Sequence, residues 1–367
     1  MRGQWIGKYA GSTDGTLILN IDETPESFVG LAYVRPTDKS LPASAAYFKT
    51  DDKSLSQKVV AHVNPIDPRN GFQCLWDDIK HLYGDNISHS QKADVLIELL
   101  EGTLRITATT DIGVKFSSEI NPPRETDESL ITGNIMSWSD FKTHIALRSK
   151  SNFLFRGQQK PWRLRTAFHR RGRYRMSHFT EQDVRQLHRR LSAITTHYFN
   201  LSVAEENGAF FNLMQHHGYP TPLLDWSRSP YVAAFFAFRD SPIDFIGDGN
   251  VRIYVFNEQE WCQHFQQIQN LDPAFLHLSV MEFIAIDNPR LVPQQSVTTV
   301  TNIDDIESYI LERESESKTR YIEAIDIPAK EREEAMRDLR FMGITAGSMF
   351  PGIDGVCEEL RENNFDR

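Results

Sequence analysis

Residues 151–165, "SNFLFRGQQKPWRLR", place an arginine at the end of an apolar run that has the composition of a β-strand. Aromatic and aliphatic side chains precede Arg156, and polar residues follow it directly. A guanidinium stays charged at physiological pH and forms paired hydrogen bonds with phosphate or carboxylate oxygens. Arg156 therefore lies either at a solvated strand end or in a cleft where it binds an anion.

A second group of polar residues precedes an apolar run in "LMQHHGYPTPLLDWSRSPYVAAFFAF" (213–238). Ser229 followed by Pro230 is typical of a helix start, and the composition of "YVAAFFAF" predicts a buried helix. The free N–H groups and the dipole of a helix start favour anions. The polar residues before this helix that can contact a ligand are Thr221, Asp225, Ser227 and Arg228.

Each polar side chain of this segment also has a purely structural interpretation. Asp225 can cap a turn, and His216 can be a hydrogen-bonded residue at a helix end. His216 and His217 are adjacent, so their side chains diverge on a helix and make a poor metal pair. The clustering of several polar groups at one buried helix start is what favours a ligand site.

Two further segments have compositions that can bind anions. "RLRTAFHRRGRYR" (163–175) holds six arginines with interleaved aromatic residues, a pattern that can bind phosphate or RNA. A solvated loop that balances an acidic protein is the interpretation we favour from sequence alone. In "NPRLVPQQSVTTV" (288–300), Arg290 and Gln294 are four residues apart and precede a β-branched run. The sequence contains none of the Walker A, GxGxxG, GxSxG and HExxH motifs, and we expect no metal site.

The amino-acid composition narrows the class of protein to which the chain can belong. The chain has 367 residues, 40% hydrophobic and 25% charged, which predicts a folded chain of two or more domains. A net charge of -10 disfavours general nucleic-acid binding. The three cysteines are scattered, and we find neither a signal peptide nor an apolar run of about 18 residues. We expect a cytoplasmic protein without a membrane segment.

The pattern of predicted secondary structure changes near residue 123, and the two patterns together predict an α+β protein. Residues 1–122 hold short β-prone runs, such as 104–109 with Leu104, Ile106 and Ala108 on one face, and they predict a barrel or sandwich, with a helix within 76–100. We expect residues 1–122 to act in ligand sensing or, as we favour, in docking. Residues 123–133 form the expected linker, and 134–367 a larger mixed α/β domain. In the latter we expect helices that start at Thr180 and Ser202.

The order "SWSDF…LFRGQ…WRLRTAFHR…QHHGYPTPLLDWSRSPYVAAFFAF…NPRLVPQQ" resembles the FRG domain family, which is named for its Phe-Arg-Gly triplet. The resemblance covers residues 134 to about 300. It departs at Pro222, where a basic residue is expected, and at Ser296, where a glycine is expected. The residues that match the family pattern are Arg156, Gly157, Gln158, His216, Gly218, Thr221, Leu224, Asp225, Arg290 and Gln294.

The order of these parts is in turn similar to the ADP-ribosyltransferase fold, in which an Arg-Gly ends the first core strand. That similarity implies NAD as substrate, with the guanidinium of Arg156 on its pyrophosphate. The turn 225–228, with Ser227, would shape the nicotinamide-ribose pocket. A carboxylate would stabilise the oxocarbenium-like transition state. Because the third segment offers Gln294 and Gln295 in place of a glutamate, Asp225 or Glu282 would have to supply it.

Two hypotheses follow from these residues. The first is an NAD-cleaving enzyme that transfers ADP-ribose to RNA, to protein or to water, in the manner of a toxin or a phage-defence effector. Its implied catalytic residues are Arg156, Asp225 and Gln294. The second is a non-catalytic module that binds a nucleotide or RNA through Arg156 and the arginines of 163–175. A nuclease is a weaker third interpretation, because the sequence shows no cluster of metal ligands.

Overall fold

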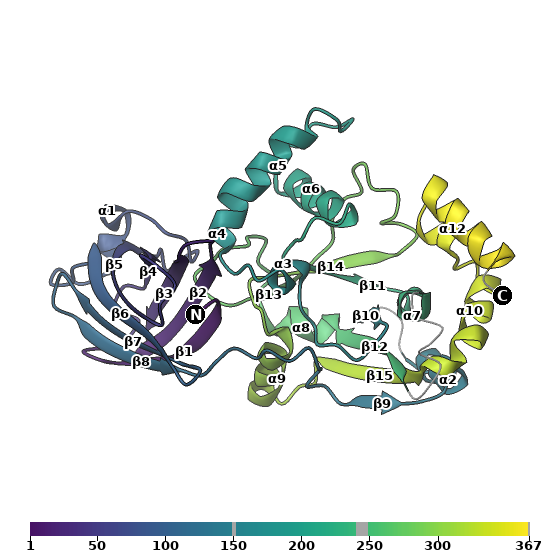
Figure 1. Cartoon of the computed structure of the whole chain (residues 1–367), viewed down its shortest axis with the longest axis horizontal. Coiled ribbons are helices and arrows are strands. Elements are labelled where there is room, and N and C mark those ends of the chain that lie inside the picture. Colours follow the sequence, from purple (N-terminus) through teal and green to yellow (C-terminus); the bar gives the residue numbers. More distant parts are fainter. Residues whose placement is uncertain (149–151, 240–248, 366–367) are drawn as a thin grey trace.

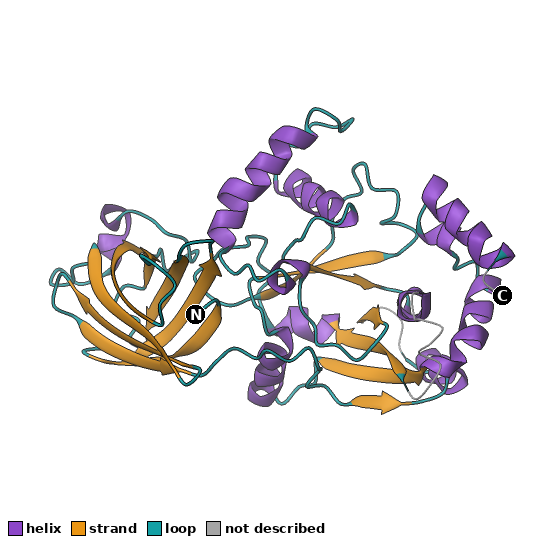
Figure 2. Cartoon of the chain, viewed as in Figure 1, coloured by secondary structure: helices purple, strands orange, loops and turns teal. Residues whose placement is uncertain are grey.

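The computed structural model describes residues 1–148, 152–239 and 249–365. It is an α+β structure with two bodies side by side, a closed β-barrel at the N-terminus and a mixed sheet covered by helices (Figures 1 and 2). Within the described ranges, none of the helices has the length and apolar composition that crossing a membrane requires.

The barrel contains eight antiparallel strands in sequence order. It closes where β1 pairs with β8, at Ala10 opposite Ser117. Along β7, the predicted alternation places Leu104, Ile106 and Ala108 in the interior. The strands are β1 (Gly3–Gly11), β2 (Gly15–Glu23), β3 (Phe28–Pro36), β4 (Ser44–Lys49), β5 (Ser56–Pro65), β6 (Lys92–Leu100), β7 (Thr103–Thr110) and β8 (Lys115–Ile120).

The helix expected within 76–100 is wrong over most of its length. Only α1 (Trp76–Ile79) and a following 3-10 turn (Lys80–Leu82) are helical. Residues 92–100 form β6, because they pair with β5 on one side and with β7 on the other. The apolar run "VLIELL" fits a helix or a strand, and the two neighbouring strands decide for the strand.

The second body is built on a seven-stranded sheet in the order β13-β14-β11-β10-β12-β15-β9. All neighbours are antiparallel except β15 and β9. The strands are β9 (Gly133–Ile135), β10 (Phe153–Gln158), β11 (Leu223–Ser227), β12 (Asn250–Asn257), β13 (Leu278–Met281), β14 (Ser296–Thr301) and β15 (Ile322–Pro328). The helices of this body are α2 (Trp138–Ala146), α3 (Ala167–Arg170), α4 (Met176–His178), α5 (Val184–Leu191), α6 (Ala204–His216), α7 (Pro230–Arg239), α8 (Glu258–His264), α9 (Ile306–Ser317), α10 (Arg332–Phe341), α11 (Ala346–Met349) and α12 (Ile353–Asn364).

The sheet divides between its two central strands. β10 pairs with β12 over its whole length, from Phe153 to Gln158, and β11 pairs with β14 over its whole length. Between β10 and β11 the only paired positions are Phe155 and Ser227. The strands diverge from that point, with β11 and β14 on one side of the gap and β12, β15 and β9 on the other (Figures 1 and 2). Polar side chains of both central strands can therefore face a common space.

The glycine of the Phe-Arg-Gly triplet lets helix α7 lie directly on β10. A Cβ atom at Gly157 would come within 1.8 Å of the Ala233 carbonyl oxygen, so no larger residue fits there. Phe155, two residues earlier on the same face, packs into the core beneath α7. The predicted start of this helix is confirmed, since the Ser229 hydroxyl accepts a hydrogen bond from the N–H of Val232 at 3.3 Å.

Two predicted helix starts are wrong. The helix assigned to Thr180 begins earlier, at Met176, and continues through a π turn (Phe179–Asp183) into α5. Thr180 is internal, and its hydroxyl donates to the Met176 carbonyl at 3.1 Å. Helix α6 begins at Ala204 without a side-chain cap, because the N–H of Ser202 is held by the Asn200 side chain in a preceding turn.

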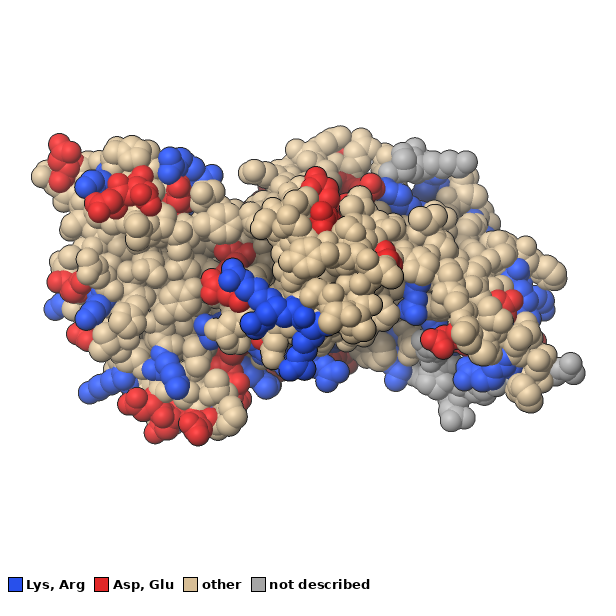
Figure 3. Space-filling view, turned by 90° about the horizontal axis from the view of Figure 1, so that it is seen from above, with Lys and Arg blue, Asp and Glu red and all other residues tan. Residues whose placement is uncertain are grey.

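The barrel contacts the segment that carries the six arginines. The carboxylate of Asp22, at the end of β2, accepts a hydrogen bond from the N–H of Tyr174 at 2.6 Å and pairs with Arg173 at 3.2 Å. Gln4 of β1 donates to the Asn302 carbonyl and accepts from the N–H of Asp304. From above, charges of both signs are interspersed, with a line of basic side chains near the junction of the two bodies (Figure 3).

Candidate functional site

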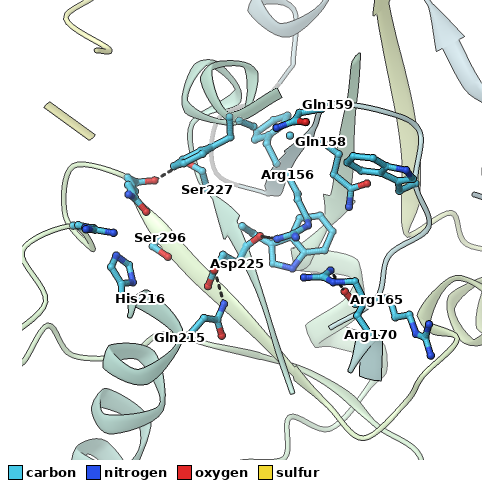
Figure 4. Close-up of a pocket in the computed structure, with 18 of the residues that line it drawn as sticks. Arg156, Gln158, Gln159, Arg165, Arg170, Gln215, His216, Asp225, Ser227 and Ser296 are labelled. Carbon is cyan, nitrogen blue, oxygen red and sulfur yellow. Dashed lines mark hydrogen bonds between the residues drawn. The ribbon is translucent and has the colours of Figure 1, made fainter. Parts of the chain in front are cut away.

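A pocket of about 710 Å³ opens where β10 and β11 separate. Its walls come from both strands, from the arginine segment, from the end of α6 and from the turn before β14 (Figure 4). The predicted site residues that line it are Arg156, Gly157, Gln158, His216, Asp225, Ser227, Arg290 and Gln294. Arg156 and Gln294, which are 138 positions apart in the sequence, are thus brought to one pocket by the sheet order.

Arg156 bridges the two diverging strands. Its Nη1 donates to the backbone carbonyl of Asp225 at 2.6 Å, and Figure 4 shows the two residues pointing toward one another. The Nε of Arg156 is buried and has no hydrogen-bond partner in the described part of the chain. Burial lowers the pKa of this guanidinium. An anionic partner for the free Nε would therefore be favourable for Arg156.

Asp225 is held by a hydrogen-bonded chain behind the pocket. Its carboxylate accepts a hydrogen bond from the side-chain amide of Gln215, and the amide oxygen of Gln215 accepts from the hydroxyl of Thr221. Burial raises the pKa of Asp225, against the opposing effects of the Arg156 charge and the Gln215 hydrogen bond. The arrangement fixes the carboxylate at the edge of the pocket.

The arginine segment forms a second wall and is not the solvated loop that we favoured. Arg163 is only 4% exposed, and none of its three guanidinium nitrogens has a hydrogen-bond partner among the described residues. Arg165 pairs with Asp304, and Arg170 lies at the exposed rim with its Nη1 on the Arg165 carbonyl. Long-range carboxylates order the segment, which the local composition does not reveal.

His169 lies behind this wall and is fully buried. Its Nδ1 is 2.7 Å from the Thr166 hydroxyl, and its Nε2 has no partner within the described ranges. Burial, with the charges of Arg165 and Arg163 nearby, lowers the pKa of His169 to about 3. His169 is therefore neutral at physiological pH and adds no charge to the arginine wall.

His216 lies on the side of the pocket opposite Arg165 and Arg170 (Figure 4), and Arg290 also lines the pocket. Burial and the charge of Arg290 lower the pKa of His216 to about 4, so this imidazole is neutral at pH 7. The Arg290 guanidinium lies 5.2 Å from the centre of the Phe350 ring. Gln294 uses its amide N–H to hold the Met349 carbonyl at 2.9 Å.

Gly218, Thr221 and Leu224 do not line this pocket. Thr221 and Leu224 are buried, and Leu224 and Gly218 line a smaller adjoining pocket of about 370 Å³. Ser227 lines the main pocket, but its hydroxyl donates to the Gln294 carbonyl at 2.7 Å.

The structure does not bring Arg228 and Glu282 into this pocket. Arg228 is exposed and pairs with Glu258 at 2.7 Å and with Glu282, so neither Arg228 nor Glu282 lines the pocket. The acidic side chains that line the pocket are Asp127 and Asp225. In the ranges that the structure covers, no three His, Cys, Asp or Glu side chains come together as metal ligands would.

Two site residues were not singled out from the sequence. Gln215, which positions Asp225, directly precedes His216 in the polar segment, but an isolated glutamine at a helix end has no distinctive signal. Arg163 is the first of six arginines, and nothing in the local sequence separates a buried arginine from its solvated neighbours. Both are recognised only when the long-range contacts are known.

The family comparison agrees with this location of the site. The model of the FRG domain matches residues 151–244, a range that contains β10, the arginine segment, α6, β11 and α7. No curated protein and no solved structure gave a significant match. The Phe-Arg-Gly triplet thus lies at the gap in the sheet, with Phe155 in the core, Arg156 in the pocket and Gly157 against α7, and residues 151–244 of the chain match the FRG domain.

Proposed function

We propose that the pocket binds NAD or a related nucleotide through its pyrophosphate and that the chain cleaves the nicotinamide–ribose bond. The observation that carries this proposal is Arg163, a buried guanidinium without a hydrogen-bond partner in the described structure. An anion that enters the pocket would supply the missing hydrogen-bond partners, and a hydrogen bond to a charged group contributes about 1.5–3 kcal/mol.

The charge balance of the lining supports an anionic ligand with more than one phosphate. Five arginines line the pocket, at positions 156, 163, 165, 170 and 290, against the two carboxylates of Asp127 and Asp225. Of these arginines, Arg165 is neutralised by Asp304. Guanidinium groups bind phosphate oxygens in pairs, and the volume of about 710 Å³ falls in the range of small-molecule sites.

The relative position of three strands supports NAD as the nucleotide. In the ADP-ribosyltransferase pattern, an Arg-Gly strand, a strand followed by a helix, and a later strand supply the site. Here the corresponding segments are β10, β11 with α7, and the start of β14, and they are neighbours in one sheet. All three contribute residues to the same pocket.

In the proposed reaction, the bond between ribose C1′ and the nicotinamide nitrogen breaks, and its electron pair leaves with nicotinamide. The positive charge that develops on C1′ and the ring oxygen is stabilised by the carboxylate of Asp225, which the Gln215 side chain holds in place. Water, or a hydroxyl or other nucleophile of an RNA or protein acceptor, then attacks C1′ and loses a proton. Such chemistry would suit a toxin or phage-defence effector.

A second candidate is nucleotide binding without cleavage. The observation in its favour is Gln294, which stands where the enzyme pattern has a glutamate and whose amide is bound to the Met349 carbonyl. A neutral amide orients a ribose but does not stabilise positive charge. Under this alternative, the same arginines bind the nucleotide, or RNA, and the chain acts as an interaction module.

Calorimetric titration of the full chain with NAD, combined with measurement of nicotinamide release, tests both candidates. We expect NAD to bind the wild type, and the Arg163→Met variant to bind at least tenfold more weakly. The matched control is Arg105→Met, because Arg105 lies on the barrel surface and pairs with Glu119.

Release of nicotinamide that Asp225→Asn abolishes supports the enzyme. Binding without release, in the presence of RNA and protein acceptors, supports the second candidate. If neither NAD, its fragments nor RNA binds, both candidates are wrong.

A further inference from the structure

The N-terminal barrel encloses a second cavity, of about 300 Å³, that is separate from the arginine pocket. It lies at the end of the barrel where the loops β1–β2, β3–β4, β5–β6 and β7–β8 meet, and residues of all four loops line it. The opposite end is filled by the core side chains of Trp5, Phe28, Leu104 and Ile120. The barrel is thus packed at one end and hollow at the other.

The cavity has a cause in the sequence. Alanines face the interior on five successive strands: Ala32, Ala46, Ala61, Ala93 and Ala108. Ala32 pairs with Ala46, and Ala61 with Ala93, so the small side chains lie side by side. An eight-stranded barrel has an interior just wide enough for larger side chains to fill. Alanine at these positions leaves space where leucine or phenylalanine would close it.

The chemistry of the wall is almost entirely apolar. Among the residues that the structure describes, no Asp, Glu, Lys or Arg lines the cavity. His89 is held at its mouth, 2.9 Å from the Ser44 hydroxyl, and burial lowers the pKa of this imidazole, so it too is neutral. A charged ligand would lose its hydration here and find no counter-charge.

One polar atom in the wall lacks a partner. Tyr9 is 3% exposed and its ring packs against Phe116, 4.9 Å between centroids. Its hydroxyl lies beside the Thr13 side chain, which also lines the cavity, and no partner satisfies full hydrogen-bond geometry within the described part of the chain. Buried tyrosine hydroxyls are normally hydrogen-bonded, so this one is free to bind a group that enters the cavity.

We propose that the barrel binds one small, neutral, mainly apolar molecule that carries a single hydrogen-bonding group, recognised by the Tyr9 hydroxyl. A dry cavity of about 150 Å³ is enough to bind benzene. Twice that volume fits a medium-chain alcohol or a molecule with two aromatic groups. The site is independent of the arginine pocket, and its ligand differs from a nucleotide in both charge and polarity.

Fluorescence titration of the full chain with the neutral probe N-phenyl-1-naphthylamine tests this site. We expect saturable binding of one probe per chain, and displacement by 1-decanol at a concentration at least tenfold lower than by decanoate. Tyr9→Phe should weaken displacement by decanol roughly threefold to tenfold, the effect of one hydrogen bond.

Ala61→Leu fills the cavity and should weaken probe binding at least tenfold. Val60→Leu is the matched control, because Val60 is the adjacent residue of β5 and is 56% exposed on the outer face. Ala108→Leu repeats the test from a different strand, in case Ala61→Leu does not fold. The proposal is overturned if the folded wild type does not bind the probe, if both folded leucine variants bind it as the wild type does, or if decanoate competes as well as decanol.

Discussion

The guanidinium of Arg156 and the backbone carbonyl of Asp225 are joined by a 2.6 Å hydrogen bond across the gap between β10 and β11. The two strands share only one pair of positions, Phe155 and Ser227, and diverge beyond it. The hydrogen bond therefore connects the two strands beyond their paired position, beside the pocket. It also leaves the Nε of Arg156 buried and unpaired, within the part of the chain described.

Arg156→Lys should weaken the hydrogen bond to the Asp225 carbonyl while it keeps the positive charge. Lysine keeps a positive charge, but its single ammonium cannot hold the Asp225 carbonyl and a phosphate in the planar geometry of a guanidinium. We expect a loss of about 1 kcal/mol in unfolding free energy, the value of one hydrogen bond, and at least a tenfold loss of nucleotide affinity. Denaturant unfolding and calorimetry measure the two effects. Equal affinity in the variant would exclude a paired contact from Arg156.

Arg163→Met, unlike Arg156→Lys, should not lower the unfolding free energy of the ligand-free protein. The methionine fills similar space without the cost of a buried charge that has no described partner. In the absence of ligand, we expect the variant to be as stable as the wild type or more stable by about 1 kcal/mol. Pyrophosphate at 100 times its dissociation constant should stabilise the wild type by about 2.7 kcal/mol, and the variant much less. Marked destabilisation of the ligand-free variant would show that Arg163 has a structural role.

Gly157→Ala should disturb the contact between β10 and α7. The added methyl group would meet the Ala233 carbonyl oxygen, which belongs to the helix backbone and cannot move aside as a side chain can. We expect a loss of about 1–3 kcal/mol in thermal or denaturant unfolding. Gly84→Ala is the control, because no atom lies within 4 Å of the added methyl at that position. Similar losses in both variants would refute the argument from close approach.

The sequence predicted the parts of the fold that depend on local patterns. The inward face of β7 and the start of α7 at Ser229 follow from periodicity and capping. The strand predicted to end at Arg156 continues to Gln158, because Gly157 and Gln158 still pair with β12. The choice between barrel and sandwich was left open, because it depends on whether Ala10 pairs with Ser117, more than a hundred residues away.

The candidate site, too, could be predicted only where local sequence patterns identify its residues. Arg156 and Asp225 stand out as polar residues in apolar surroundings, and the structure brings them together. Glu282 has the charge that the analogy requires, but Arg228 binds it outside the pocket lining. Arg163 is buried because residues far away in the sequence bind the arginines next to it. A segment of six arginines has the same composition whether it is solvated or buried, so its sequence does not reveal this burial.

Asp22→Asn should show that the barrel supports the pocket. The Asp22 carboxylate accepts hydrogen bonds from the N–H groups of Tyr174 and Arg175 and pairs with Arg173. Its neutralisation should destabilise the chain by about 1–3 kcal/mol and weaken nucleotide binding several-fold, although Asp22 does not line the pocket. The control Asp94→Asn changes an exposed residue of β6. Unchanged nucleotide affinity in a destabilised Asp22→Asn variant would show that the pocket does not depend on the barrel.

His169 should make the protein sensitive to acid. Its pKa is about 3 in the folded chain and 6.5 in an unfolded chain, so the unfolded state binds more protons between these values. The stability that neutral His169 contributes is therefore complete above pH 6.5 and is lost as the pH falls toward 3. His169→Gln stays neutral, so between pH 7 and pH 4.5 it should lose about 2–3 kcal/mol less unfolding free energy than the wild type. Denaturant unfolding at the two pH values measures this difference, with the exposed His62→Gln on β5 as control. Parallel losses in wild type and His169→Gln would show that burial does not lower the pKa of His169 in the folded chain.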